Sequence, residues 1–560
     1  MKKAQRKGSS NRFVLSAVYG VLGLTTSALT HATEIEIKPV ISSTYTYIGE
    51  ADFSGVNFDT PIEEGHQALL LSPGISMIAT GPVWNGTWNL SHTNIKQLNS
   101  DIGDSSYSDV SLNNQFGFVK DRVVLSVNGS RRNQNIDQRF AGVSDPIFSQ
   151  GEYIDVDSGT VGLTLKNKSG SHWQNSLSYN FTTTDYNEND LEETSNRAIN
   201  LNKGDTQNAE LRLMFGRQAN KVRGSFIVNG NSINRDIRGR QDYLAASFNV
   251  QVPIWASFDM VVNGEKSRNS IANNNFDSSN LDNEYYGAGL AWRFGKRSFV
   301  AVTINKDSKG QTQFNDSEDF DDTFVGYRVV FEPSKRTLLS YQNSRRFYGE
   351  SHNFSYRKTG NNWDINVGYS EDLGSTSRLV NEAVSAGVYS CNPALTFREA
   401  CIPLSGFPEI PNPSRVYFEF FDNNYLIQEV LTLSKAANAQ ITYRGKKSTL
   451  TLSYSKGTQE FLELQNEAFG SEQDSEQWSV SFNHRMSRRT SFVTSVNETN
   501  VTSNGTSGNR DGFQASIGLE RRLTRKATGK LNIRRFDNDG NSGTQNRKDT
   551  RLELQYTYQF

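Results

Sequence analysis

The chain has 560 residues, of which 35% are hydrophobic and 11% aromatic, including 33 Phe and 22 Tyr. Disordered chains are poor in aromatic residues, so this polar composition does not indicate disorder. Residues 1–32 carry five basic and no acidic groups, and removing them leaves 54 basic against 60 acidic residues, a net charge of −6. This balance is not that of a nucleic-acid-binding protein.

The N-terminal 32 residues have the layout of a secretory signal peptide. A basic start is followed by a mostly apolar stretch over 13–29, and Thr30-His31-Ala32 supplies the small residues that cleavage requires. A single membrane anchor is the alternative, but the stretch is short and is interrupted by Ser, Thr and Gly. We therefore predict a signal peptide over 1–32 and a single domain over 33–560.

From residue 35 onward, apolar residues recur at every second position. Successive side chains of a strand alternate between two faces, so such runs predict strands with one apolar and one polar face. No segment shows a sustained 3.6-residue period, and no later stretch is long and apolar enough for a membrane-spanning helix. The chain is therefore expected to be all-β. The plainest runs are Trp84, Gly86, Trp88, Leu90; Val161, Leu163, Leu165; Ala288, Leu290, Trp292, Phe294; and Phe513, Ala515, Ile517, Leu519.

The predicted strands are joined by links that alternate in length. Outer-membrane barrels have short periplasmic turns and longer extracellular loops, and here mostly longer polar links, such as 185–193 and 316–322, separate the short ones. Eleven short turns predict a transmembrane antiparallel β-barrel of about 24 strands, within a range of 20–26 because the pairs around 336–358 and 422–456 are ambiguous. The short links are expected near 80–83, 119–122, 167–172, 216–221, 253–255, 295–297, 333–335, 359–362, 444–447, 487–489 and 524–526.

The last ten residues, 551–560, form one of these strands. Phe560, Tyr558 and Tyr556 lie on its apolar face together with two leucines, and polar residues fill the other face. The segment resembles the C-terminal signal that the assembly machinery recognises in bacterial outer-membrane barrels, whereas a strand of a soluble sheet is the alternative. We expect it to pair with residues 34–47 and to close the cylinder.

Tryptophans gather near the short turns. Amphipathic aromatic side chains belong at the membrane–water boundary, so this placement predicts an aromatic girdle on the periplasmic side. The alternative is ordinary packing at strand ends. Five of the seven tryptophans are involved: Trp84, Trp173, Trp255, Trp292 and Trp363.

The longest expected link covers residues 371–420. It holds five of the twelve prolines, and because proline interrupts a strand ladder, we expect a long Pro-rich loop. Cys391 and Cys401 are the two cysteines of the chain, and in an oxidising compartment this spacing predicts a disulfide within the loop. The loop either constricts the mouth of a pore or lies outside it.

Chemical motifs are absent as far as spacing can show. There is no nucleophile elbow, zinc-protease motif, phosphate-binding loop or dinucleotide turn. We therefore expect no enzyme activity, no cofactor and no metal site.

Arginines on or near the strands are more informative. An Arg facing lipid at the membrane midplane costs about 2–4 kcal/mol, so these residues are expected to point into a lumen. A lumen of Arg, Asn, Gln and aromatic residues suits polyhydroxylated or anionic solutes, although any water-filled barrel is lined in this way. The set is Arg131, Arg132, Arg212, Arg223, Arg328, Arg345, Arg346, Arg534 and Arg535, and the candidate lumen-lining residues are Arg212, Arg223, Arg328 and Arg534.

The first strand pair resembles a large family of outer-membrane β-barrel porins. Residues 43–47 (Ser-Thr-Tyr-Thr-Tyr) and 71–75 (Leu-Ser-Pro-Gly-Ile) are similar to the T-Y-T-D-N and S-P-G-I stretches that open members of that family. This chain has Tyr47 and Ile48 where the family favours Asp-Asn. Members are found with exosortase and PEP-CTERM systems and with exopolysaccharide export loci. The resemblance implies an outer-membrane barrel associated with exopolysaccharide secretion, with no catalytic residue to carry over.

Together these observations lead us to expect a passive outer-membrane conduit for a hydrated polymer or polar solute, foremost an exopolysaccharide. The alternatives are a general or substrate-specific porin and a structural or adhesive surface barrel. An outer-membrane hydrolase is disfavoured because no nucleophile–base grouping is visible. The expected partners are outer-membrane lipids, lipopolysaccharide, the barrel assembly machinery and polysaccharide export proteins, and not nucleic acid.

Overall fold

The structure of the protein is a computed structural model that describes most of the chain after residue 33. The described residues are 34–52, 65–99, 103–119, 122–135, 147, 153–167, 172–186, 203–216, 221–235, 239–273, 276–295, 297–307, 323–346, 349–391, 401–404, 416–461, 472–503, 509–540 and 547–560. The predicted signal peptide lies outside them. Among these residues, no helix is long and apolar enough to cross a membrane.

The chain forms a closed antiparallel barrel of 24 strands, which confirms the predicted fold class and strand number. A further short strand, β18, lies outside the wall. The strands are β1 (Glu34–Asp52), β2 (His66–Thr80), β3 (Trp84–Gln97), β4 (Ser105–Phe118), β5 (Val123–Asn135), β6 (Tyr153–Lys166), β7 (Trp173–Tyr186), β8 (Gly204–Phe215), β9 (Arg223–Arg235), β10 (Gly239–Trp255), β11 (Phe258–Asn273), β12 (Phe276–Arg293), β13 (Phe299–Asp307), β14 (Thr323–Ser334), β15 (Thr337–Arg346), β16 (Gly349–Thr359), β17 (Trp363–Cys391), β18 (Ile402–Leu404), β19 (Val416–Arg444), β20 (Ser448–Phe461), β21 (Glu472–Arg485), β22 (Thr490–Ser503), β23 (Arg510–Arg522), β24 (Ala527–Gly540) and β25 (Arg547–Gln559).

The barrel closes where the sequence predicts. β25 pairs with β1, and Tyr558, Tyr556 and Leu554 stand opposite Ile41, Ser43 and Tyr45. Neighbouring strands in sequence are joined at one end by eleven short links, each at or within a few residues of its predicted position. Three links at the opposite end are also short, with two residues between β11 and β12 and between β15 and β16 and three between β9 and β10, although mostly longer ones were expected at that end.

The strand register joins the apolar faces into one continuous band. At the closing seam Tyr45 faces Leu554, and farther round Leu290 faces Val302 and Ile441 faces Leu452. Because directly opposed residues of paired strands share a face, one face of the wall is apolar over the whole circumference.

The polar face is the inner one. The guanidinium carbon of Arg223 in β9 lies 5.6 Å from the ring centroid of Phe299 in β13. These strands are four positions apart, roughly 19 Å along the wall at normal strand spacing. Side chains so far apart meet only across a concave surface, so their register faces the lumen and the apolar register faces outward. A closed barrel with an outward apolar band satisfies its backbone polar groups inside a bilayer, and the protein resides in the outer membrane.

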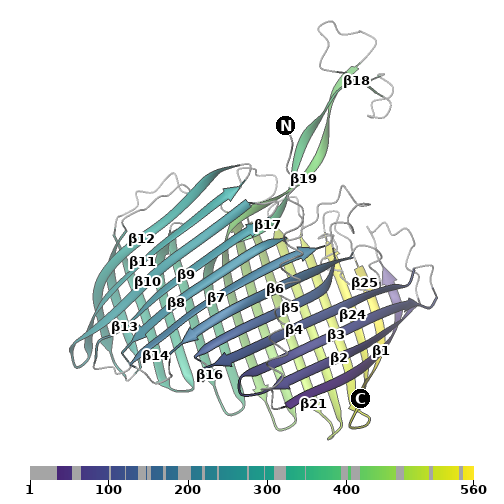
Figure 1. The fold of residues 1–560 in the computed structure, drawn as a ribbon, viewed down its shortest axis with the longest axis horizontal. Coiled ribbons are helices and arrows are strands. Elements are labelled where there is room, and N and C mark those ends of the chain that lie inside the picture. Colours follow the sequence, from purple (N-terminus) through teal and green to yellow (C-terminus); the bar gives the residue numbers. More distant parts are fainter. Residues whose placement is uncertain are drawn as a thin grey trace.

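Side chains are crowded at two bends of the wall. In Figure 1, β1–β12 cross the near side, and the wall turns to the far side at β12–β14 on the left and at β25–β1 on the right. Inner-face residues at the first bend are buried, such as Val261, Ala291 and Ala301, and so are Thr46 and Arg551 at the second. In contrast, no described side chain of β5–β8 or β20–β23 is buried. Among the described residues, side chains therefore crowd the lumen at its bends and not along these broad walls.

The segment over 371–420 differs from the expected loop. β17 and β19 pair continuously from Trp363 opposite Tyr443 to Cys391 opposite Val416, so 371–391 and 416–420 are strand. β16 reaches only to Tyr369, and β20 only to Thr432. Beyond these points the two strands form a ribbon that extends away from the barrel, with β18 near its tip (Figure 1). The described part of this segment does not cross the mouth of the barrel.

The cysteine pair lies near the tip of this ribbon. Cys401 is disulfide-bonded. The side chain of Cys391 lies outside the described residues, so the pairing of Cys391 with Cys401 stays a prediction, although the chain has no third cysteine.

Four of the five tryptophans near short turns project from the wall as expected of a girdle. Trp173, Trp255, Trp292 and Trp363 are 57%, 74%, 52% and 50% exposed. Trp84 differs because it is fully buried, packed on Ala79 and Phe116. Its indole donates a hydrogen bond to Asn114 at 3.2 Å, which holds the ring against the wall.

Candidate functional site

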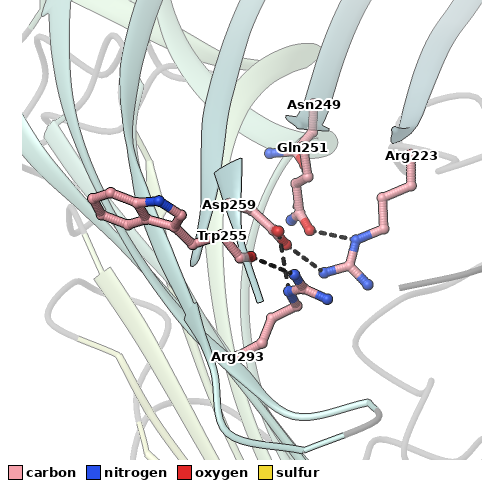
Figure 2. A network of polar contacts seen from close by, with 6 residues as sticks. All are labelled: Arg223, Asn249, Gln251, Trp255, Asp259 and Arg293. Carbon is pink, nitrogen blue, oxygen red and sulfur yellow. Dashed lines mark hydrogen bonds and ion pairs between the residues drawn. The ribbon is translucent and has the colours of Figure 1, made fainter. Parts of the chain in front are cut away.

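The first bend carries a buried ion-pair network near its short-turn end, drawn in Figure 2. Asp259 is the second residue of β11, directly after the turn at 256–257, and its side chain is 1% exposed. Its carboxylate oxygens lie 3.3 Å from Nη2 of Arg223 in β9 and 3.0 Å from Nε of Arg293 in β12. The inner register of three strands thus brings two guanidinium groups to one carboxylate.

Neighbouring groups hold these two arginines in place. Arg223 Nε donates to Oε1 of Gln251 at 2.7 Å, and Gln251 stands directly opposite Arg223 in the strand ladder. Gln251 Nε2 donates in turn to Oδ1 of Asn249 at 3.4 Å, and Arg293 Nη2 donates to the backbone oxygen of Trp255 at 3.3 Å. Both guanidinium groups are therefore fixed from more than one side.

Arg328 lies beside this network without sharing its partners. It belongs to the inner register of β14, where it stands opposite Ala301 and Gln342. Its guanidinium carbon lies 5.9 Å from the ring centroid of Phe299, the ring that Arg223 also approaches. Over the part of the chain that the structure describes, it makes no hydrogen bond or ion pair. Arg328 thus presents a half-buried positive charge held by a ring and not by an anion.

A cavity of about 210 Å³ opens above the network, between β9–β11 on one wall and β13–β15 on the other. Its lining includes Asn249, Asn263, Asn305, Gln342, Glu265 and Arg328. Glu265 accepts a hydrogen bond from Oη of Tyr285 at 3.2 Å, and these residues stand opposite each other in β11 and β12. The polar part of the lining consists of amides and hydroxyls with one carboxylate and one guanidinium, and Ile227, Phe248, Val261, Ala301 and Phe324 supply an apolar part.

Small residues allow the wall to bend here. A Cβ added at Gly289 would lie 1.9 Å from the backbone oxygen of Val302, and one added at Gly287 would lie 2.0 Å from Oδ1 of Asn305. Such contacts are far below van der Waals distance, so only glycine permits β12 and β13 to approach in this way.

The second bend carries another buried polar cluster, near the opposite end of the strands. Nε of Arg551 lies 2.6 Å from Oδ1 of Asp549, and both side chains are at most 1% exposed. His66 Nε2 lies 2.8 Å from Oε1 of Gln97, whose Nε2 donates to the backbone oxygen of Ile147 at 2.9 Å. Ile147, between β5 and β6 in sequence, thus lies at the inner wall.

The four candidate lumen-lining arginines all fall in the inner register, but they do not form one site. Arg223 and Arg328 meet over Phe299 at the first bend. Arg212 in β8 pairs with Glu210 at 2.8 Å, and Arg534 in β24 pairs with Glu553 at 3.3 Å. Whether any of them contacts a permeating solute stays a prediction, as does the assembly role of Phe560, Tyr558 and Tyr556.

Three further arginines were expected on the inner face and lie on the outer register instead. Arg131, Arg345 and Arg535 share the register of their apolar neighbours, in the half of each strand nearer the long links. The side chain of Arg345 nevertheless turns inward, because its guanidinium carbon lies 5.8 Å from the ring centroid of Phe324, which lines the inner cavity. Arg131 forms two 2.7 Å contacts with Asp157 there. Arginine near the edge of the hydrocarbon layer costs far less than at its midplane, because the guanidinium reaches the polar head groups.

Sequence reasoning missed most of the network and cavity residues, including Asp259, Arg293, Glu265, Asn263 and Asn305. A signal was available for Asp259, since it is a carboxylate in the polar register between Phe258 and Met260, next to a short turn. Nothing in the sequence shows that β9 and β13 come within reach of each other. Over the described chain, no group of three or more His, Cys, Asp or Glu could hold a metal ion.

No protein-family model and no curated protein matches the chain. Several solved structures are similar to it. The FrpB iron transporter from Neisseria meningitidis (F5-1 variant) gives a TM-score of 0.46 at 9% identity, with 94% of this chain and 83% of that chain covered. The siderophore receptor PirA from Pseudomonas aeruginosa gives 0.40 at 10%, with 93% and 80% covered. The alcaligin receptor FauA from Bordetella pertussis gives 0.38 at 9%, with 92% and 76% covered. These values are too low to transfer any of those functions to this chain.

Proposed function

We propose that the protein is a passive outer-membrane channel for a hydrated polar polymer, associated with exopolysaccharide export. Energy and polymer synthesis would come from other proteins, and the proposal includes no catalytic step and no cofactor. Polysaccharide export proteins, lipopolysaccharide and the barrel assembly machinery are the partners that this role requires.

The observation that carries the proposal is the contrast between the broad walls and the bends. No described side chain of β5–β8 or β20–β23 is buried, so the inner face of these strands is accessible. This face is polar, whereas the outer face is apolar. A barrel of this strand number is wide enough to enclose an aqueous passage. A passage lined by amides, hydroxyls and charged groups suits a chain of sugars, which offers hydroxyls throughout its length.

Conduction and export test different parts of the proposal. Purified protein in a planar bilayer is expected to give discrete single-channel currents, and absence of any conductance would refute the proposal that the protein is a channel. Deletion of the gene is expected to abolish secreted polysaccharide while outer-membrane permeability to small solutes stays unchanged. Unchanged export together with reduced uptake of small solutes would instead identify a general or substrate-specific porin.

The projecting ribbon of β17 and β19 favours a second candidate, a structural or adhesive surface barrel. Between the barrel wall and β18, the described ribbon pairs with no other described strand, so its strand edges are available to a partner. Removing residues 385–415 separates the two roles. Loss of cell-surface attachment with unchanged polysaccharide export would favour the adhesive barrel, and the reverse result would favour the conduit.

A further inference from the structure

The cavity at the first bend has the chemistry of a ligand site. At about 210 Å³ it is smaller than pockets that hold drug-sized ligands, so it matches a single small polar unit. It lies on the inner wall beside the aqueous passage. Any unit that entered it would come from a molecule passing through the lumen.

Two lining amides have acceptor atoms without partners. Oδ1 of Asn263 and Oδ1 of Asn305 are buried, and neither accepts a hydrogen bond from any described residue. Asn305 is 1% exposed, and its Nδ2 is already used as a donor to Oγ1 of Thr303 at 3.1 Å. Buried acceptors of this kind favour a ligand that brings hydroxyl donors, because each unmade hydrogen bond is costly.

The charge on this wall is not balanced. Arg223 and Arg293 share one carboxylate, Asp259, and Arg328 has no anionic partner among the described residues, while Glu265 supplies the second carboxylate. Within this set of five charged side chains, which leaves out the neighbouring Arg345 and Arg346, one positive charge remains. Since Asp259 already occupies the other two arginines, this charge is centred on Arg328. One monovalent anion would neutralise it.

We propose that this cavity binds one carboxylate-bearing sugar unit, such as a hexuronate, of a polymer or solute in the lumen. The Arg328 guanidinium binds the carboxylate through its planar fork of donors, a geometry that matches a carboxylate better than an ammonium group would. Asn263 and Asn305 accept hydrogen bonds from sugar hydroxyls. Glu265 repels the carboxylate and accepts hydrogen bonds from hydroxyls, so it orients the unit with its acidic end toward Arg328. This inference rests on the proposed function, because it assumes that carbohydrate enters the barrel.

Equilibrium binding to the full-length, detergent-solubilised protein tests the site. Titration calorimetry with glucuronate, glucose, acetate and glucose 6-phosphate separates the sugar ring from the charge. Glucuronate is expected to bind at least about tenfold more tightly than glucose or acetate, since it alone supplies both hydroxyls and a single carboxylate. Equal affinities for glucuronate and glucose would overturn the proposal. Tighter binding of glucose 6-phosphate would overturn the assignment of a carboxylate.

Arg328→Gln is the decisive variant, and Arg534→Gln is its control. Both remove an inner-register guanidinium, but Arg534 lies in β24 and is paired with Glu553. Arg328→Gln is expected to weaken glucuronate binding roughly 10- to 100-fold and to leave glucose unaffected, because one charged hydrogen-bonding group is lost. Arg534→Gln should change neither. Equal losses in both variants, or none in Arg328→Gln, would refute the site. If Arg328→Gln does not fold, Arg328→Lys keeps the charge without the fork and should weaken binding about tenfold.

Failure of this inference is distinguishable from failure of the channel. Binding is measured in detergent and does not require conduction. Conductance without glucuronate binding would support the proposed channel function and refute the proposed binding site. Glucuronate binding without conductance would support the site as a lumen-facing pocket and refute the channel.

Discussion

Asp259→Asn is the most informative perturbation of the wall. The substitution keeps size and shape but removes the negative charge between Arg223 and Arg293. At 3.3 and 3.0 Å, each ion pair is worth roughly 5 kcal/mol of direct attraction at an effective dielectric constant of about 20. The cost of burying the carboxylate, several kcal/mol, offsets part of this sum.

The expected net loss of stability is about 2–4 kcal/mol, toward the lower side of values for broken buried ion pairs, because Arg223 is 24% exposed to the lumen. Denaturant unfolding in lipid vesicles, followed by tryptophan fluorescence, measures the free energy of unfolding. Channel recordings give a second readout, since loss of one buried negative charge leaves two guanidinium groups uncompensated and should shift ion selectivity toward anions.

Asp157→Asn is the matched control. It removes the same group from an ion pair with Arg131, where the side chains are 34% and 49% exposed. An exposed pair of this kind contributes about 1 kcal/mol or less. If Asp259→Asn were no more destabilising than Asp157→Asn, the network would not hold the bend, and the reasoning from burial and charge would be wrong.

Two further predictions concern the bend and the ribbon. Gly289→Ala is expected to reduce the yield of folded barrel, because the added Cβ would lie 1.9 Å from the Val302 backbone oxygen. Gly230→Ala is the control and should fold normally, since its Cβ would meet nothing closer than 3.8 Å. Heat-modifiable gel migration measures the folded fraction of both variants, and equal folding would refute the packing argument. Deletion of residues 385–415 is expected to leave single-channel conductance unchanged, since the described ribbon extends away from the barrel; a clear rise in conductance would show that this segment constricts the pore.

Much of the architecture follows from local patterning. A period of two needs only neighbouring residues, and it predicted the strands, the eleven short turns and the closure of β25 on β1. The same alternation separated inner from outer faces, so Arg223 and Arg328 were predicted to face the lumen. The separate assumption that every strand arginine faces the lumen failed for Arg131 and Arg535, because a residue type alone does not show how deep in the membrane a strand position lies.

The candidate site depended on distances that no local pattern contains. Asp259 meets Arg223 because β9 and β11 both pair with β10, which brings the two side chains to nearly the same level of the wall. Arg223 reaches Phe299 because the wall bends sharply between β9 and β13. The bend in turn depends on which small residues, such as Gly289 and Ala301, become opposed across the ladder. The ribbon of β17 and β19 likewise continues past the ends of its neighbours, which strand periodicity did not reveal. The sequence by itself determined a closed wall with an apolar outside and a polar inside. Its curvature, the charges gathered at the bend and the cavity above them were decided by tertiary structure, because they depend on contacts between strands that are not neighbours.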